Sequence, residues 1–109
     1  MVFQVFPVST LNAYIQQVLA ADDILADVWI EGEISSITYA RSGHVYFKLC
    51  DDDAVIDGAM WRTFFSRQTI RPSVGDSIVV HGRIDYYTAQ GRLQIIADVF
   101  EHQGRGILA

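Results

Sequence analysis

The chain has 109 residues, of which half are hydrophobic, with one cysteine and a formal net charge of −5. This size and composition fit one folded domain and exclude a disordered chain, an internal disulfide and a cysteine metal cluster. No apolar run approaches the ~20 residues of a membrane span, and the first residues lack the basic and apolar segments of a signal peptide, so we expect a soluble, cytoplasmic protein.

The charge is divided unevenly along the chain. Residues 1–60 hold two basic and nine acidic side chains, whereas residues 61–109 hold six arginines and four acidic side chains. Nucleic-acid-binding domains are usually basic, so the net charge alone disfavours that function. The arginine-rich second half nevertheless predicts a polarised surface, because arginine can both stack on bases and pair with phosphates.

The first predicted element is a helix from about Thr10 to Ala21, with Ser9 as its N-cap. Apolar side chains recur at helical spacing along it: Leu11, Tyr14, Ile15, Val18 and Leu19. Such a stripe belongs to the core of a domain more often than to a partner-binding surface. We therefore expect this helix to pack on the core through the stripe.

Five strands are predicted after the helix, each with alternating apolar and polar residues: Val28–Ile34, His44–Leu49, Val55–Trp61, Ser77–Asp85 and Leu93–Phe100. This alternation indicates an antiparallel sheet with one face toward solvent. In the last strand the inward set is Leu93, Ile95, Ala97 and Val99, and in the fourth strand Val79, His81 and Arg83 are expected to point outward.

Gly32, Gly58 and Gly82 fall in mid-strand on the predicted inner face, which favours a coiled, closed sheet. The connections are a loop at 35–43, an aspartate turn at 51–53, a short helix at 62–70 and a hairpin loop at 87–91. This order predicts a mainly β protein, a five-stranded OB-fold Greek-key barrel with an N-terminal helix and a short helix between strands three and four. We assign residues 1–23 to a helical extension, 24–103 to the barrel and 104–109 to the start of a linker.

In such a barrel, rings and cations from separate segments would line one groove, as on a surface that binds single-stranded nucleic acid. The candidate residues are Tyr39, Arg41, His44, Tyr46, Lys48, Trp61, Arg62, Arg67, Arg83, Tyr87 and Arg92. Two alternatives stay open. Tyr46 and Trp61 could simply pack under loops, and His44 could serve a structural hydrogen bond instead of a base contact.

No catalytic, metal or cofactor site is expected in this chain. Asp51, Asp52 and Asp53 are consecutive in a tight turn, so their side chains diverge and lack the spacing of a calcium loop. Asp57 adds only a weak case for a metal-dependent nuclease. The sequence has no nucleophile elbow and no glycine-rich phosphate loop before a helix, and Cys50 shows no sign of activation.

An ordered set of segments resembles the N-terminal domain of the exodeoxyribonuclease VII large subunit: Val8–Asn12, Val28–Ser35, Ser42–Leu49, Ala59–Arg62, Val80–Arg83 and Tyr87–Ile95. Trp61 stands where that family usually has Phe, and Arg62 matches the family's Arg. Ser36 replaces a common Asn and Cys50 a frequent Lys. These two changes remove polar or basic character beside the groove, which implies weaker binding.

The resemblance implies an OB-fold that binds single-stranded DNA as part of a nuclease. It implies that the complete enzyme degrades single-stranded DNA from either end into short oligonucleotides and needs no added divalent metal. It also implies a catalytic region C-terminal to this domain and a coiled-coil segment that recruits small subunits. Our main hypothesis is a DNA-binding domain that is not catalytic alone. The alternative is a protein-docking or oligomerisation module, with a homodimer of this domain as one form. A catalytic aspartate cluster is the weakest hypothesis.

Overall fold

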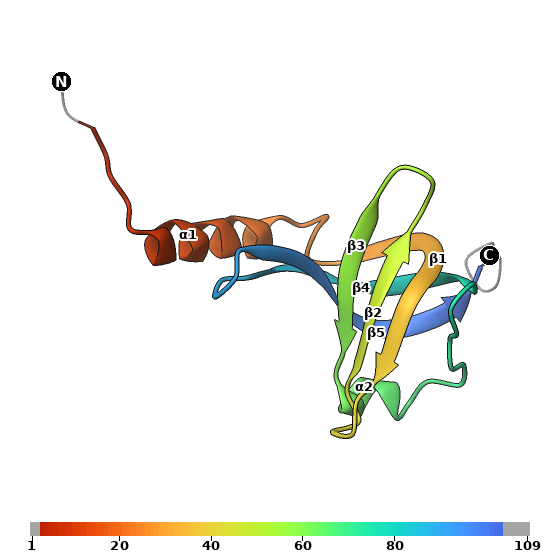
Figure 1. Cartoon of the computed structure of the whole chain (residues 1–109). Coiled ribbons are helices and arrows are strands. Elements are labelled where there is room, and N and C mark those ends of the chain that lie inside the picture. The colour runs from red at the N-terminus through yellow and green to blue at the C-terminus, as the bar shows by residue number, and fades with distance from the viewer. Residues whose placement is uncertain (1–2, 104–109) are drawn as a thin grey trace.

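The computed structural model describes residues 3–103, which form one helix beside a small β-barrel (Figure 1). The predicted linker at 104–109 lies outside these residues. The elements in chain order are α1 (Val8–Ala21), β1 (Val28–Tyr39), β2 (Val45–Cys50), β3 (Val55–Met60), α2 (Arg62–Phe65), β4 (Ser77–Tyr87) and β5 (Arg92–His102). Within the described part of the chain, neither helix is long and apolar enough to cross a membrane.

The five strands close into a barrel in the order β1-β2-β3-β5-β4. β3 and β5 pair in parallel, and all other neighbours pair antiparallel. This is the five-stranded Greek-key topology of an OB-fold, so the predicted fold class is confirmed. The predicted order of helices and strands is confirmed as well, including the short helix between β3 and β4.

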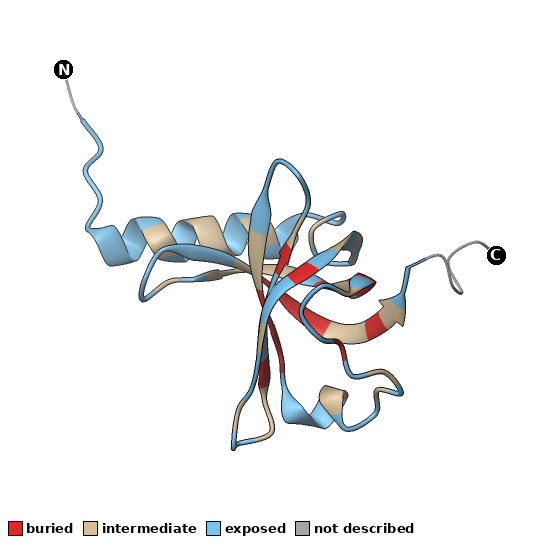
Figure 2. Ribbon diagram, turned by 45° about the vertical axis from the view of Figure 1, so that its right-hand side comes forward, coloured by how far each residue is buried: buried red, intermediate tan, exposed pale blue. Residues whose placement is uncertain are grey.

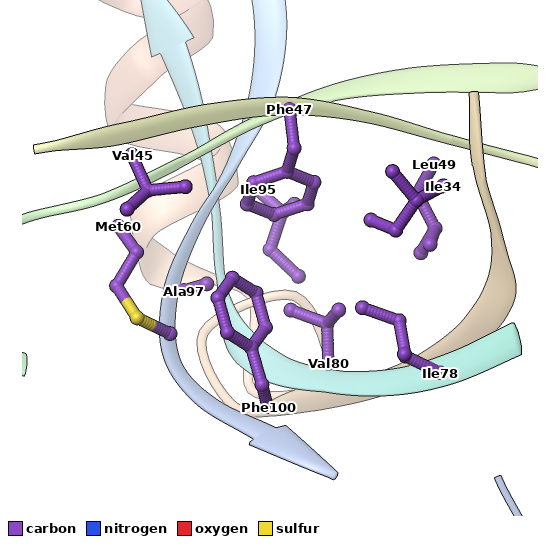
Figure 3. Packing of buried hydrophobic residues seen from close by; sticks show 10 residues of the cluster. All are labelled: Ile34, Val45, Phe47, Leu49, Met60, Ile78, Val80, Ile95, Ala97 and Phe100. Carbon is purple, nitrogen blue, oxygen red and sulfur yellow. The ribbon is translucent and has the colours of Figure 1, made fainter. Parts of the chain in front are cut away.

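The core is a single cluster inside the barrel, where the buried residues in Figure 2 concentrate. Every strand contributes to it, and Figure 3 shows the side chains meeting across the interior: Ile34, Val45, Phe47, Leu49, Met60, Ile78, Val80, Ile95, Ala97 and Phe100. The rings of Phe47 and Phe100 meet edge to face, with centroids 5.4 Å apart. Gly58 sits directly over Phe47, and a Cβ there would lie 2.2 Å from the ring. Glycine at this position therefore makes room for one of the two phenylalanine rings of the core.

β1 is longer than predicted, and the expected loop at 35–43 is mostly strand. The register with β2 shifts between Ile34 and Ser36, which marks a bulge at Ser35. Beyond the bulge the pairing continues to Tyr39, opposite Val45. A bulge reverses the alternation of side chains and so hides a continuing strand from a period-two pattern.

A second bulge changes which residues of β5 enter the core. His81 pairs with Val99 but Gly82 pairs with Ala97, so Asp98 is the extra residue. The alternation reverses there, and Phe100 is buried in the core in place of the predicted Val99.

Two further expectations about side-chain direction were wrong. Leu93 is 51% exposed, because the β4–β5 hairpin extends past the barrel wall. Val79, predicted outward, is buried between the longer side chains of its sheet partners Glu31 and Glu101.

The expectation that α1 packs on the core was wrong. The helix contains no buried residue, and it lies along the protruding β4–β5 hairpin (Figure 1). Hydrogen bonds join it to the hairpin: Asn12 Nδ2 donates to the carbonyl of Thr88 at 2.9 Å, and Gln16 Nε2 donates to the carbonyl of Tyr86 at 3.3 Å. The strands already fill the barrel, so much of the apolar stripe remains exposed on Leu11, Tyr14 and Val18.

Both helix boundaries also differ from prediction. Pro7, not Ser9, holds the N-cap position of α1, and no side chain caps it. α2 ends at Phe65 instead of Ile70. After it, the side-chain amide of Gln68 donates to the carbonyl of Asp98 at 3.0 Å and accepts from the backbone N–H of Phe100 at 2.9 Å. These bonds tie the chain to β5 as an irregular loop.

Candidate nucleic-acid interface

The strand register brings outward-facing side chains of all five strands into two rows. One row runs across the barrel through Thr38, Tyr46, Ala59, Ile96 and Arg83, and the next through Ser36, Lys48, Asp57, Gln94 and Asp85. Ala59 and Ile96 point outward yet are 1% and 8% exposed, because larger neighbours cover them. The surface is therefore hollowed along its middle, with Tyr46 on one side and Arg83 on the other.

A groove of about 340 Å³ occupies the part of this surface formed by β1, β2, β3 and the start of β5. Its lining combines two aromatic residues, hydroxyls, an amide, a carboxylate and two cations: Ser36, Thr38, Tyr46, Phe47, Lys48, Asp57, Gly58, Arg92 and Gln94. Ser36, Thr38 and Gln94 were not among the predicted site residues. The bulge in β1 hid the first two, and Gln94 carries no signal in isolation.

The aromatic residues form a cluster at one end of the groove. The Trp61 ring lies 6.5 Å from Tyr46 and 5.3 Å from His44, in both cases at an interplanar angle of 77°. Tyr46 is 45% exposed and Trp61 36%, so neither ring is covered by a loop. The alternative that these two rings only pack under loops is therefore wrong. Partly exposed rings of this kind can stack on bases.

His44 makes the structural hydrogen bond that the sequence left open. Its Nδ1 accepts the backbone N–H of Arg62 at 2.9 Å, so a neutral ring carries its proton on Nε2. The bond fixes the turn from β3 into α2 and thereby holds Trp61 against His44. The Nε2 edge remains available as a donor.

The cations of the surface differ in how firmly they are paired. Lys48 Nζ lies 2.9 Å from Asp57 Oδ1, and Arg83 lies 3.7 Å from Asp85. Exposed ion pairs of this kind contribute only about 0–1 kcal/mol, so a phosphate can replace the carboxylate. Among the residues that the structure describes, Arg41, Arg62 and Arg92 form no ion pair.

Three predicted site residues stand apart from the aromatic cluster. Tyr39 donates its hydroxyl to the carbonyl of Pro72 and packs on Phe65, and burial raises the pKa of that hydroxyl above its ordinary value. Arg67 lies over the Phe64 ring and lines a separate cavity beside α2. Tyr87 is half exposed at the end of β4, opposite Arg92 and next to the hairpin tip.

One polar cluster on the barrel was missed by the sequence analysis. His81 Nδ1 bonds to Asp98 Oδ1 at 2.6 Å, its Nε2 bonds to Asp27, and its ring lies 4.7 Å from that of Trp29. The hydrogen bond that His81 donates to Asp27, and then the one it donates to Asp98, raise the pKa of His81 above its ordinary value, against the effect of burial. No local pattern connects positions 27, 81 and 98, which only the barrel brings together.

This cluster leads to a prediction about stability and pH. A histidine whose pKa is raised on folding stabilises the native state fully below its unfolded pKa of about 6.5, and that contribution disappears as the pH rises through the folded value. We expect the free energy of unfolding to fall between pH 6 and 9 in the native chain and to change less in His81→Gln. Urea denaturation at both pH values measures this, and an equal fall in the two proteins would contradict it.

The aspartate turn between β2 and β3 is organised by its first residue. Asp51 Oδ1 accepts the backbone N–H groups of Asp53 and Ala54, each at 2.9 Å. This is the ordinary use of aspartate in a turn. Within residues 3–103, the structure shows no group of three or more histidine, cysteine or acidic side chains arranged to hold a metal ion.

The barrel and its surface of rings and cations define a class, the OB-fold nucleic-acid-binding domains. The sequence profile of the family described as "OB-fold nucleic acid binding domain" matches residues 6–101, and the chain belongs to that family. The chain is also 42% identical over 88 residues to the exodeoxyribonuclease 7 large subunit of Acholeplasma laidlawii. The resemblance seen in the sequence is thereby confirmed. The match covers 81% of this chain but 20% of that protein, so the chain spans about a fifth of its relative.

Solved structures with the same fold are more distant. A Stn1–Ten1 complex of S. pombe matches with a TM-score of 0.56 and 24% identity, over 69% of this chain and 56% of that one. A replication protein A heterotrimer bound to single-stranded DNA matches with a TM-score of 0.56 and 17% identity, over 72% and 57%. Asparaginyl-tRNA synthetase from Pyrococcus horikoshii has a TM-score of 0.55 and 9% identity, over 71% and 19%. At these identities the likeness concerns the fold alone.

Proposed function

We propose that this chain is the single-stranded-DNA-binding domain of an exodeoxyribonuclease that degrades single-stranded DNA from either end into short oligonucleotides. The observation that carries the proposal is the exposed Tyr46–Trp61 pair at the end of a groove that also holds Lys48 and Arg92. Rings provide stacking for any base, and the cations provide the phosphate contacts. The relative's identity as an exodeoxyribonuclease large subunit supports a nuclease as the parent protein.

In this proposal the domain holds DNA and does not itself cut it. The catalytic region would lie in the part of the parent protein outside this chain, as would the segment that recruits small subunits. The parent enzyme would work in the cytoplasm. The aspartate turn supports this division of labour, because Asp51 is engaged in holding the turn.

The test is a titration with a 12-nucleotide oligo-dT at several salt concentrations. For single-stranded DNA, a plot of the logarithm of the binding constant against the logarithm of the salt concentration has a negative slope. Each phosphate that the protein neutralises contributes about −0.7 to this slope. Three unpaired arginines predict a slope of roughly −2, and exchange of Lys48 and Arg83 onto phosphates would steepen it to roughly −3.5. A Trp29→Phe background leaves Trp61 as the fluorescent reporter. Binding that does not respond to salt, or no binding at low salt, would contradict the proposal.

A docking or oligomerisation module is the second candidate, and the exposed face of α1 favours it. No residue of α1 is charged, and Val8, Leu11, Tyr14 and Val18 are 76%, 45%, 63% and 50% exposed. This candidate predicts self-association that increases with protein concentration, including a homodimer, together with no salt-dependent DNA binding. Sedimentation velocity over a hundredfold concentration range, run beside the DNA titration, separates the two candidates.

A further inference from the structure

A second pocket lies beside the groove, on the other side of Trp61. Its volume is about 270 Å³, and its walls are Trp61, Phe64, His81, Arg83 and Asp98. Gly82 and Ala97 also line it, at the point where the bulge in β5 displaces the strand. Pockets for drug-sized ligands hold about 300–1,000 Å³, so this one suits a smaller group. Because Trp61 also contacts Tyr46, a strand stacked on Tyr46 would reach this pocket within one nucleotide step.

The polar groups of the pocket include one donor and one acceptor with unused bonding capacity. Arg83 has only its loose contact of 3.7 Å with Asp85. Asp98 uses Oδ1 for His81, and its Oδ2 forms no hydrogen bond or ion pair with any described residue. His81 holds the Asp98 carboxylate in place, and Asp27 holds His81 from the other side. The acceptor is thus held in place by His81, which is itself a wall of the pocket.

The pocket holds charges of both signs, an arrangement that suits a neutral base with both donor and acceptor atoms. A phosphate entering it would face the Asp98 carboxylate, and like charges repel. A neutral base would face aromatic walls with an acceptor and a donor on the rim. A carboxylate accepts well from the exocyclic amine of cytosine. Uracil and thymine have their only ring donor between two carbonyl oxygens, which repel a carboxylate.

We propose that this pocket receives one unstacked base of the bound strand and prefers bases that carry an exocyclic amine, with Asp98 as the acceptor and Arg83 as the donor. The inference rests on the proposed function, since it needs a strand bound along Tyr46 and Trp61. The inference goes beyond that function by predicting a preference among bases. Stacking and phosphate contacts on the rest of the surface would not distinguish one base from another. Trp61 would stack on the base from the groove side.

The test compares the affinities of the 109-residue chain for dC12 and dU12 at pH 7.5 and low salt. The two oligonucleotides share backbone and ring size and differ in the edge that would face Asp98. We expect the native chain to bind dC12 about fivefold more tightly, which corresponds to roughly 1 kcal/mol. Asp98→Asn should bring the ratio close to one, because an amide can donate to a carbonyl as well as accept from an amine.

Asp52→Asn is the matched control. It makes the same chemical change at an exposed position in the turn between β2 and β3, and Asp52 lines neither the pocket nor the groove. It should therefore keep the preference for dC12, and circular dichroism should show that both variants fold. Three results would each overturn the pocket and leave the proposed function intact: equal affinities in the native chain, a preference that survives in Asp98→Asn, or a preference that is lost in Asp52→Asn. If neither oligonucleotide binds, the proposed function itself fails.

Discussion

Replacing Trp61 with alanine is expected to weaken oligo-dT binding by roughly five- to 150-fold, since one stacked base contributes about 1–3 kcal/mol. Tyr46→Ala should have an effect in the same range. The two rings meet edge to face, with centroids 6.5 Å apart, so the effects of a double variant should not simply add. Fluorescence anisotropy of a labelled 12-nucleotide oligo-dT at low salt measures all three proteins.

Two further variants identify what is lost in Trp61→Ala. Trp61→Phe keeps a ring at the site and should retain most of the affinity. Trp29→Ala removes an exposed indole that packs on His81 but lines neither the groove nor the pocket, and it should weaken binding far less. Native affinity in Trp61→Ala, or an equal loss in Trp29→Ala, would show that the strand does not bind along this groove. The double variant Trp61→Ala, Arg62→Ala adds the loss of one phosphate contact and should also reduce the salt dependence.

The second large effect concerns the core. Gly58→Ala is expected to destabilise the barrel by about 1–3 kcal/mol, as overpacking of a filled core does. The added Cβ would lie 2.2, 2.4 and 2.8 Å from three carbons of the Phe47 ring, which is 3% exposed and packed on Phe100. In a domain of this size each kcal/mol lowers the melting temperature by about 4–8 °C. Thermal unfolding followed by circular dichroism measures the change.

A compensating substitution makes this prediction specific. Phe47→Leu removes the ring that the new methyl group would meet, so Gly58→Ala should cost less stability in that background than in the native one. Gly82→Ala is the contrasting case, because its Cβ would meet the backbone carbonyl oxygen of Ile96 at 2.2 Å and no side-chain change can relieve that. Equal costs of Gly58→Ala in both backgrounds would show that Phe47 is not the obstacle.

Local patterns in the sequence were enough to determine the fold class. The alternation in Val45, Phe47 and Leu49 correctly separated core from surface in β2, and Tyr46 and Lys48 are exposed as predicted. Mid-strand glycines indicated a closed barrel, because a Cβ at Gly58 or Gly82 cannot be accommodated inside it. The order of the strands and of the short helix along the chain was then compatible with only a few barrel topologies, among them the OB-fold. The alternation in β2 and the positions of the glycines depend only on a residue and its near neighbours in the chain, so both can be seen in the sequence.

The tertiary structure alone decided which side chains meet. Bulges at Ser35 and Asp98 reversed the alternation, extended β1 and placed Phe100 in the core, because pairing with a neighbouring strand can continue past an extra residue. The register of the β2–β3 hairpin paired Lys48 with Asp57, and closure of the barrel joined Asp27, His81 and Asp98, positions far apart in the chain. A core already filled by strands left α1 outside it. The sequence thus determined the barrel and the two exposed residues of β2, while contacts between distant residues decided which rings and charges form the surface around them.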